Sequence, residues 1–349
     1  MSDKDEEIVF ASIYTPDKAW LSRAVPETVL EPELPIIDTH FHLSAFNGHR
    51  YMLDEFRKDI VSCGHNIDAT VFVECGTQYV ETGPDHMKPV GETQFITALT
   101  ASEQDGGSSD IAAAIVAFAD LTLGDRTHEV LLAHIGAAKG RLRGIRQRAK
   151  WDADPRVKGK YSADIPHLYL QPAFSEGMRT MASLGLSFDA SVYHPQIPDV
   201  TALARAHPEV KVILIHSGSP VGHSSYAGRE KENHADWLSS MKDFADCPNA
   251  YVKLGGVLMN LANFDFLREK APPTSERLAQ LWRPYIEPCI ELFGAERCMV
   301  SSNFPVDKAG FSYATVWNMF KHITRGCSAH EKEMVHSGTA RHVYRINGS

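Results

Sequence analysis

Short apolar runs alternate with amphipathic stretches along most of this chain of 349 residues. The apolar runs are rich in Val, Ile, Leu, Ala or Phe, and most end in polar residues or glycine, which is typical of buried strands. Eight runs are predicted as strands, over residues 34–40, 68–76, 112–120, 141–147, 186–193, 210–218, 250–256 and 298–304. Helical periodicity predicts helices over residues 51–64, 91–104, 128–140, 199–207, 236–246, 313–324 and 330–346.

Alternation of strands and helices predicts an α/β fold whose strands pair in parallel through right-handed crossovers. Eight such units in about 310 residues suit a closed (β/α)8 TIM barrel with long βα loops. A doubly wound open sheet is the alternative, but its usual glycine-rich turn after the first strand is replaced here by "DTHFHLSAF". We expect residues 1–33 to form an N-terminal arm over a barrel domain of residues 34–349.

Composition narrows the classes of function. The chain is 43% hydrophobic, 23% charged and has a net charge of -9, with Lys and Arg scattered among the acids, which argues against nucleic acid as a partner. No apolar run reaches the roughly 20 residues that span a bilayer, and "MSDKDEE" lacks the features of a signal peptide. Six cysteines without a C-x-x-C pair argue against a disulfide framework. We expect a cytoplasmic protein with a small-molecule substrate, and the choice between monomer and homo-oligomer stays open.

Side chains that could take part in catalysis lie at the predicted strand ends, which form the catalytic mouth of a (β/α)8 TIM barrel. Residues 38, 40 and 42 share one strand face because side chains alternate, so two imidazoles point at one place. His40 and His42 end the first strand, and His216 ends the sixth. Such a set of imidazoles can hold a divalent metal, and we expect Asp38 to accept a ring N–H and fix a tautomer.

The fourth strand, "RLRGIRQRAKW", carries several arginines. Arg143 and Arg146 are expected to face opposite ways, with Arg148 on the face of Arg146. A buried guanidinium suits either a substrate carboxylate or an ion pair with a protein acid, and both interpretations stay open. Lys253 on the seventh strand is expected either to pair with a strand-end acid such as Glu74 or to act in catalysis.

Two long segments are predicted as loops near the mouth. Residues 217–237 include Tyr226 and Arg229 and are predicted as a lid or specificity loop. Residues 76–92 follow the second strand and are predicted mainly as a solvated loop.

Five motifs resemble the amidohydrolase superfamily over about residues 34–346: "DTHFH", His194 in "YHPQ", "IHSGSP", "VKLGG" and "SSNFPVD". Within this superfamily, the chain most resembles the branch that contains sugar lactonases and 2-pyrone-4,6-dicarboxylate lactonase. The resemblance implies a metal held by the His-x-His pair and other strand-end histidines, with an aspartate after the eighth strand as ligand and general base. At that place this chain has Asn303, which is a weaker ligand and cannot accept a proton at neutral pH.

The leading hypothesis is a hydrolase that opens a lactone of a small oxygenated or carboxylated substrate. The expected metal ligands are His40, His42 and His216, with zinc the favoured ion and a metal-free mechanism as the alternative. The expected catalytic residues are His194, His216, Asn303 and Asp307, with Asp307 either returning to the mouth as base or capping the next helix. The expected substrate-binding residues are Arg143, Arg146, Tyr226 and Arg229. A non-oxidative decarboxylase and a non-catalytic, carboxylate-binding barrel are the alternatives.

Overall fold

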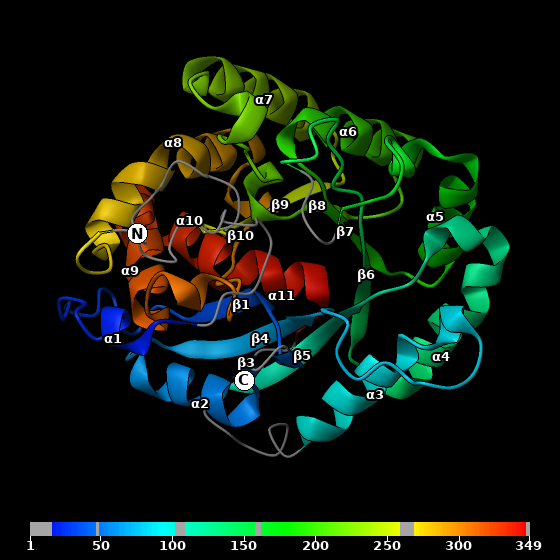
Figure 1. Ribbon diagram of the computed structural model, residues 1–349, viewed down its shortest axis with the longest axis horizontal. Helices are drawn as coiled ribbons and strands as arrows, with labels where there is room; N and C mark the ends of the chain where they lie inside the picture. Colours follow the sequence, from blue (N-terminus) through cyan, green and yellow to red (C-terminus); the bar gives the residue numbers. More distant parts are fainter. Residues whose placement is uncertain (1–15, 47–48, 102–108, 158–161, 259–268, 347–349) are drawn as a thin grey trace, which may run out of the picture.

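The computed structural model describes residues 16–46, 49–101, 109–157, 162–258 and 269–346. Eight strands pair in parallel and follow one another in chain order around the barrel in Figure 1. They are β1 (Ile36–Phe41), β4 (Ile67–Val73), β5 (Asp110–Ala117), β6 (Leu142–Arg148), β7 (Ser187–Ser191), β8 (Val212–Leu214), β9 (Ala250–Leu254) and β10 (Cys298–Val300). All eight predicted strands are present, so the predicted (β/α)8 barrel is confirmed.

Contacts between β1 and the chain after β10 close the sheet. The backbone N–H of His42 donates to the carbonyl of Phe304 over 2.8 Å, and the N–H of Asn303 donates to the carbonyl of His40 over 2.9 Å. Thr39 Oγ1 also donates to the carbonyl of Val300 over 2.7 Å. These bonds place the ends of the first and eighth strands side by side at the mouth.

Helices surround the strands in Figure 1. They are α2 (Leu53–Ser62), α3 (Val90–Leu99), α4 (Thr127–Ala138), α5 (Pro172–Ser183), α6 (Ile197–Ala206), α7 (Glu230–Ala245), α8 (Ser275–Phe293), α9 (Tyr313–Ile323), α10 (Ala329–Glu333) and α11 (Thr339–Tyr344). The sequence pattern did not predict α5 or α8, and the last three residues of the predicted helix 91–104 lie outside the described residues. The predicted helix 330–346 is divided into α10, a π-helical turn at Met334–Gly338 and α11.

The predicted lid over residues 217–237 is shorter than expected, because α7 already begins at Glu230. Within the predicted loop 76–92, a 3-10 turn forms at Asp85–Met87 and α3 begins at Val90. A hairpin that the pattern did not predict, β2 (Ser44–Phe46) with β3 (His49–Tyr51), follows β1.

The C-terminal helix closes the end of the barrel opposite the mouth. Side chains of α11, including Val343 and Tyr344, pack in one apolar cluster with barrel-facing residues such as Ile37 and Val71. The hydroxyl of Tyr344 also donates to Asp189 over 3.3 Å. Figure 1 shows α11 lying across the barrel behind the strands. Only the carboxyl ends of the strands therefore remain for a site.

The described part of the N-terminal segment, residues 16–33, lies against the later helices. A short helix, α1 (Lys18–Leu21), carries Trp20, whose ring N–H donates to the carbonyl of Glu269 over 2.8 Å. Farther along, the N–H of Leu30 donates to the side chain of Asn318 on α9 over 2.9 Å. Among the helices of the described residues, none has both the length and the apolar character needed to cross a bilayer.

Candidate active site

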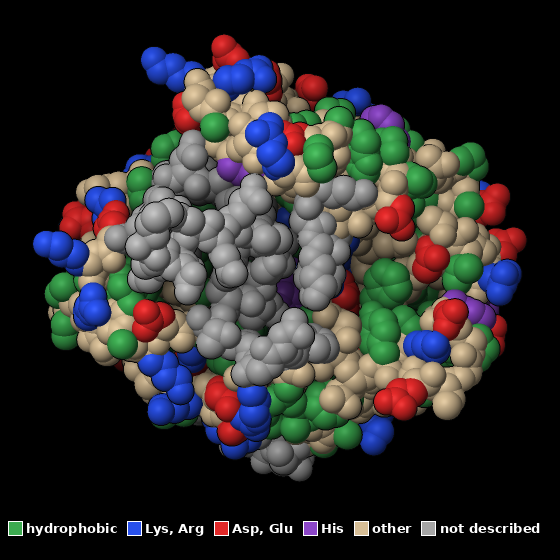
Figure 2. All heavy atoms as spheres, viewed as in Figure 1, with side chains coloured by type: hydrophobic (Ala, Val, Ile, Leu, Met, Phe, Trp, Pro, Cys, Tyr) green, Lys and Arg blue, Asp and Glu red, His purple; other side chains and the backbone are tan. Residues whose placement is uncertain are grey.

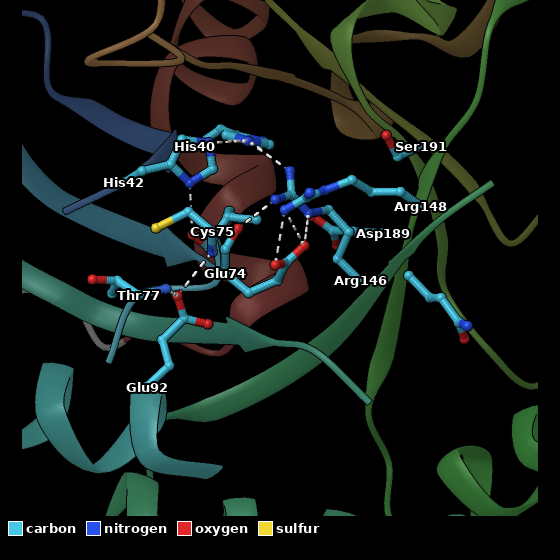
Figure 3. A network of polar contacts seen from close by, with 12 residues as sticks. His40, His42, Glu74, Cys75, Thr77, Glu92, Arg146, Arg148, Asp189 and Ser191 are labelled. Atoms are coloured by element: carbon cyan, nitrogen blue, oxygen red, sulfur yellow. Dashed lines mark hydrogen bonds and ion pairs between the residues drawn. The ribbon is translucent and has the colours of Figure 1, made fainter. Parts of the chain in front are cut away.

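Two histidines from the end of β1 form the centre of the mouth (Figure 3). The Nε2 atoms of His40 and His42 lie 3.2 Å apart, as expected for side chains on one strand face. His42 Nδ1 lies 2.7 Å from the carbonyl oxygen of Val73, which can only accept, so the ring proton is on Nδ1 and the lone pair is on Nε2. Burial, followed by the charge of Arg146, lowers the pKa of His42 to about 3, so this ring is neutral at physiological pH.

His216, from the end of β8, stands over this pair. The ring centroids of His216 and His40 are 4.6 Å apart. Burial lowers the pKa of both rings well below the usual histidine value. Neighbouring histidine, lysine and arginine side chains lower both pKa values further. The structure therefore brings together the three imidazoles that the sequence pattern singled out, all in neutral form.

A buried ion-pair cluster lies beside the histidines, as Figure 3 shows. Arg146 Nε donates to Glu74 Oε1 over 2.7 Å, and Arg148 Nη2 donates to both carboxylate oxygens of Glu74, at 3.0 and 2.9 Å. Burial raises the pKa of Glu74, but the two guanidinium groups outweigh that effect and hold it below its usual value. The remaining arm of Arg146, Nη1, lies 3.2 Å from His40 Nε2.

These contacts give Arg146 a definite role in the free protein. A guanidinium has no acceptor, so the Nε2 lone pair of His40 accepts its N–H, and of the two rings only His42 keeps an Nε2 lone pair that is not engaged by Arg146. Arg146 therefore links the acid of β4 to the histidine of β1, and the protein-acid interpretation of the arginines describes what the structure shows.

A further buried acid, Glu92, supports this cluster. Glu92 Oε1 accepts the backbone N–H groups of Cys75 and Thr77, at 2.9 and 3.0 Å, and so fixes the turn that follows Glu74. Burial and the nearby charge of Glu74 raise the pKa of Glu92 to about 7.

The suggestion that Lys253 pairs with Glu74 is wrong, because its Nζ lies 2.6 Å from Asp189 on β7.

The turn after β10 brings Asn303 and Asp307 together. Asn303 Nδ2 donates to Asp307 Oδ1, and the N–H of Val257 donates to Asp307 Oδ2, both over 2.8 Å. Burial nevertheless raises the pKa of Asp307 to about 8. The alternative that Asp307 caps the next helix is wrong, since the hydroxyl of Ser312 caps α9 by accepting from Thr315 N.

Asp38 does not hold a histidine ring, contrary to expectation. Its carboxylate accepts from the backbone N–H of Ser302 over 2.9 Å, from the Ser302 hydroxyl over 2.5 Å and from the Tyr313 hydroxyl over 2.9 Å. On its own strand its only described partner is the backbone N–H of His40, at 3.2 Å. Asp38 therefore joins β1 to the turn after β10 and positions His40 and Asn303 through the backbone.

Two expected substrate-binding arginines lie away from the mouth. Arg143 Nε donates to the carbonyl of Tyr344 over 2.6 Å, and Tyr344 belongs to the helix that closes the opposite end of the barrel. Arg229 is exposed next to the start of α7 and pairs with Glu232 at 2.8 Å. The structure gives neither side chain a place in the cluster, because Arg143 is near the beginning of its strand and Arg229 lies on the outer surface.

His194 and Tyr226 form a separate contact beside the mouth. His194 Nδ1 accepts the N–H of Val221 over 3.1 Å, and its ring centroid is 5.4 Å from that of Tyr226. The Tyr226 hydroxyl donates to Asp152 over 2.7 Å. These residues join the loops after β6, β7 and β8, and no described contact joins His194 to the other histidines.

Lys150, two residues beyond β6, is a residue that the sequence interpretation missed. Its side chain is buried, and its Nζ has no hydrogen-bond partner among the described residues. Burial, with the charges of Arg146 and Arg148, lowers its pKa to about 7. Its spacing from Arg146 and Arg148 continues the alternation of the strand and was a signal for the same face.

The backbone around the site is held in uncommon conformations. His216, Ser217, Ser219 and Asn303 have φ values of 54, 49, 46 and 56 degrees, in the left-handed region that residues with a Cβ seldom adopt. Such conformations persist only where the surrounding structure enforces them, and they concentrate at functional sites. Polar side-chain atoms of His216, Ser217, Ser219 and Asn303 are also buried without a partner in the described structure.

A cavity of about 730 Å³ adjoins the cluster at the ends of β4, β5 and β6. Glu74 and Arg148 form part of its wall, and Tyr79 and Thr122 add hydroxyl groups. Figure 2 shows acidic and basic side chains interspersed over the outer part of this face of the molecule. The cavity gives a small polar molecule room beside the Glu74 ion pairs.

The side chains of the mouth do not fit a divalent metal as they stand. Within the described ranges, no three His, Cys, Asp or Glu side chains converge as a metal-binding group. Arg146 Nη1 directs a fixed positive charge at His40 Nε2, the nitrogen that a metal would need. Asp307, the nearest acid to Asn303, is already bonded through both oxygens.

Comparison with known proteins agrees with this architecture. A family model described as amidohydrolase matches residues 37–346. An uncharacterised protein of Sinorhizobium fredii, y4mH, is 31% identical over 337 residues, which covers 90% of this chain and 99% of that protein. An L-fucono-1,5-lactonase of Burkholderia multivorans is 23% identical over 278 residues, or 75% of this chain and 86% of that enzyme.

A solved structure shares the fold. An amidohydrolase of Burkholderia multivorans, crystallised with bound zinc, superposes with a TM-score of 0.66 at 21% identity and covers 89% of this chain and 99% of its own. The resemblance read from the strand-end motifs, including that to lactonases, is confirmed by the family match and by the lactonase relative. This chain belongs to the amidohydrolase family.

Proposed function

We propose that this protein hydrolyses the ester bond of a small lactone. The observation that carries the proposal is the charge of the buried mouth, where two guanidinium groups, those of Arg146 and Arg148, share a single carboxylate, Glu74. Water attack on a lactone carbonyl creates negative charge on oxygen, and fixed positive groups in a site away from water stabilise that charge strongly. The lactonase among the relatives supports the same reaction class.

The reaction needs one base. We assign this role to Asp307, whose carboxyl group accepts the amide N–H of Asn303 in the turn after β10. Burial raises the pKa of Asp307 to about 8, so the ionised form is the minor one at pH 7 and grows as the pH rises. In that form Asp307 takes a proton from water while the oxygen of that water bonds to the carbonyl carbon. The tetrahedral intermediate then collapses, the ring C–O bond breaks, and the leaving oxygen takes the proton back from Asp307. One lactone and one water molecule therefore give one hydroxy acid.

The neutral histidines assist without changing charge. The Nε2 lone pair of His42 offers a hydrogen-bond acceptor to water or to a substrate hydroxyl, whereas that of His40 already accepts from Arg146. Asn303 holds Asp307 in place through its amide N–H. No step passes through a metal, because the donor set described above does not fit one.

An experiment with Asp307→Asn tests this assignment. Lactones are supplied as a panel and hydrolysis is followed by the acid released, using a pH indicator. We expect wild-type protein to turn over at least one lactone and the variant to lose at least about 100-fold in kcat, which is the lower range for a general base. Full activity of Asp307→Asn would reject Asp307 as base, and carbon dioxide release in place of ring opening would favour a decarboxylase.

A further inference from the structure

Lys150 differs from the other buried lysines in the described part of the chain. Lys253, fully buried, is paired with Asp189 at 2.6 Å, and Lys321, 2% exposed, donates to the carbonyl of Glu31 over 2.7 Å. Lys150 is 3% exposed, yet its Nζ has no hydrogen-bond partner there and lies 5.1 Å from the ring centroid of Tyr193. A buried ammonium group is costly unless an anion accompanies it.

The neighbouring charges leave Lys150 without an anion of its own. Glu74, the acid beside the two arginines of the same strand, is already bound by both Arg146 and Arg148. Asp189 is occupied by Lys253, and burial raises the pKa of Asp307 to about 8, so that carboxyl is mostly neutral at pH 7. The mouth therefore carries excess positive charge.

The surroundings of Lys150 can complete a site for an anion. Lys150 Nζ lies 5.1 Å from the ring centroid of Tyr193, and the next residue, His194, donates its backbone N–H to the carbonyl of Ser219 over 3.3 Å. These contacts place the ammonium group near the turn after β8. In that turn the hydroxyls of Ser217 and Ser219 are buried and lack partners among the described residues. An ammonium group with hydroxyl donors nearby is a common arrangement for binding a carboxylate.

We infer that Lys150 binds a carboxylate group of the substrate, so that the protein acts on anionic lactones in preference to neutral ones. This inference rests on the lactonase function proposed above and narrows its substrate class. It moves the carboxylate-binding role from Arg146, which Glu74 and His40 already occupy, to the buried cation that has no acid partner.

The test compares a lactone that carries a carboxylate with its primary carboxamide, which has nearly the same shape and no charge. We expect Lys150→Met to raise KM for the carboxylate by about 30-fold, as for loss of one partner of a desolvated charge pair, with kcat almost unchanged. KM for the carboxamide should change little. Lys321→Met, which removes a buried lysine bonded outside the mouth, serves as the matched control, and Lys150→Gln replaces the first variant if that one does not fold.

Separate outcomes distinguish the two proposals. Equal KM values for the carboxylate in wild type and Lys150→Met would overturn the inference while leaving lactone hydrolysis intact. If neither lactone is hydrolysed, the proposed function fails, and binding of glutarate by calorimetry decides the inference alone. Binding that weakens by about 30-fold in Lys150→Met and not in Lys321→Met would support it, and equal binding by all three proteins would overturn it.

Discussion

Glu92 supports the mouth from a position that sequence patterns do not reveal. It lies in the first turn of α3, where an acid is ordinarily expected to face solvent, yet it is buried and accepts two backbone N–H groups of the turn after β4. Burial and the charge of Glu74 raise its pKa from 4.5 to about 7. The folded protein therefore holds a proton on Glu92 that the unfolded chain has already released in this range.

The raised pKa of Glu92 predicts a pH dependence of stability. Between about pH 4.5 and 7 the native state binds more protons than the unfolded state, so this carboxyl makes the free energy of unfolding fall as the pH rises through that window. Glu92→Gln keeps an oxygen for both N–H groups and cannot ionise. The free energy of unfolding of the variant, relative to that of wild type, should therefore be roughly 3 kcal/mol higher at pH 8 than at pH 5. Urea denaturation of both proteins at the two pH values measures this difference, and parallel pH dependences would contradict it.

Single residues at the strand ends could be predicted because strands alternate their faces. That rule brought His40 and His42 together and placed Arg146 and Arg148 on one face, where both bind Glu74. It could not say which cation meets which acid, so Lys253 was assigned to Glu74 instead of Asp189. It also could not show that Arg143 lies too near the start of β6 to reach the mouth.

At the scale of elements, the turn after β8 depends on a close approach from the turn after β9. A Cβ added to Gly256 would lie 2.4 Å from His216 Nδ1, and Gly256 itself has a φ of +66 degrees. Any side chain at this position must push His216 away or alter the backbone. The position of His216 is thus set by a glycine on a neighbouring strand end.

We therefore expect Gly256→Ala to lower kcat for lactone hydrolysis by about tenfold or more, because small displacements in a catalytic site cost orders of magnitude in rate. Gly222→Ala is the control, since a Cβ there meets nothing within 4 Å. Steady-state kinetics of both variants, with melting temperatures to confirm folding, provide the measurement. Unchanged kcat in a folded Gly256→Ala protein would show that the position of His216 does not matter for the reaction.

The elements that sequence patterns missed have identifiable reasons. Helix α8 contains Pro284 and Pro288, and proline inside a pattern is normally read as a helix end. Helix α5 includes Gly177, which packs against the backbone of Leu121 so closely that a Cβ would lie 2.3 Å from the Leu121 carbonyl oxygen. In both helices tertiary packing outweighs weak local preference.

At the scale of the whole molecule, the repeated alternation of strand and helix made the barrel predictable, but its closure was not. Closure depends on backbone bonds between β1 and the turn after β10, and on α11, which fills the far end. Those contacts join residues far apart in the chain. The consequence for function is that the positive mouth is a buried site formed by many strands, and no single motif contains it.

The central claim is that this mouth opens lactones with its own charged and neutral side chains. The most direct measurement is the initial rate of lactone hydrolysis by protein treated with a chelator, compared with the same protein supplied with zinc. We expect equal rates, because Arg146 directs its charge at His40 and the described donors do not form a metal-binding group. Activity that is lost on chelation and restored by zinc would contradict it.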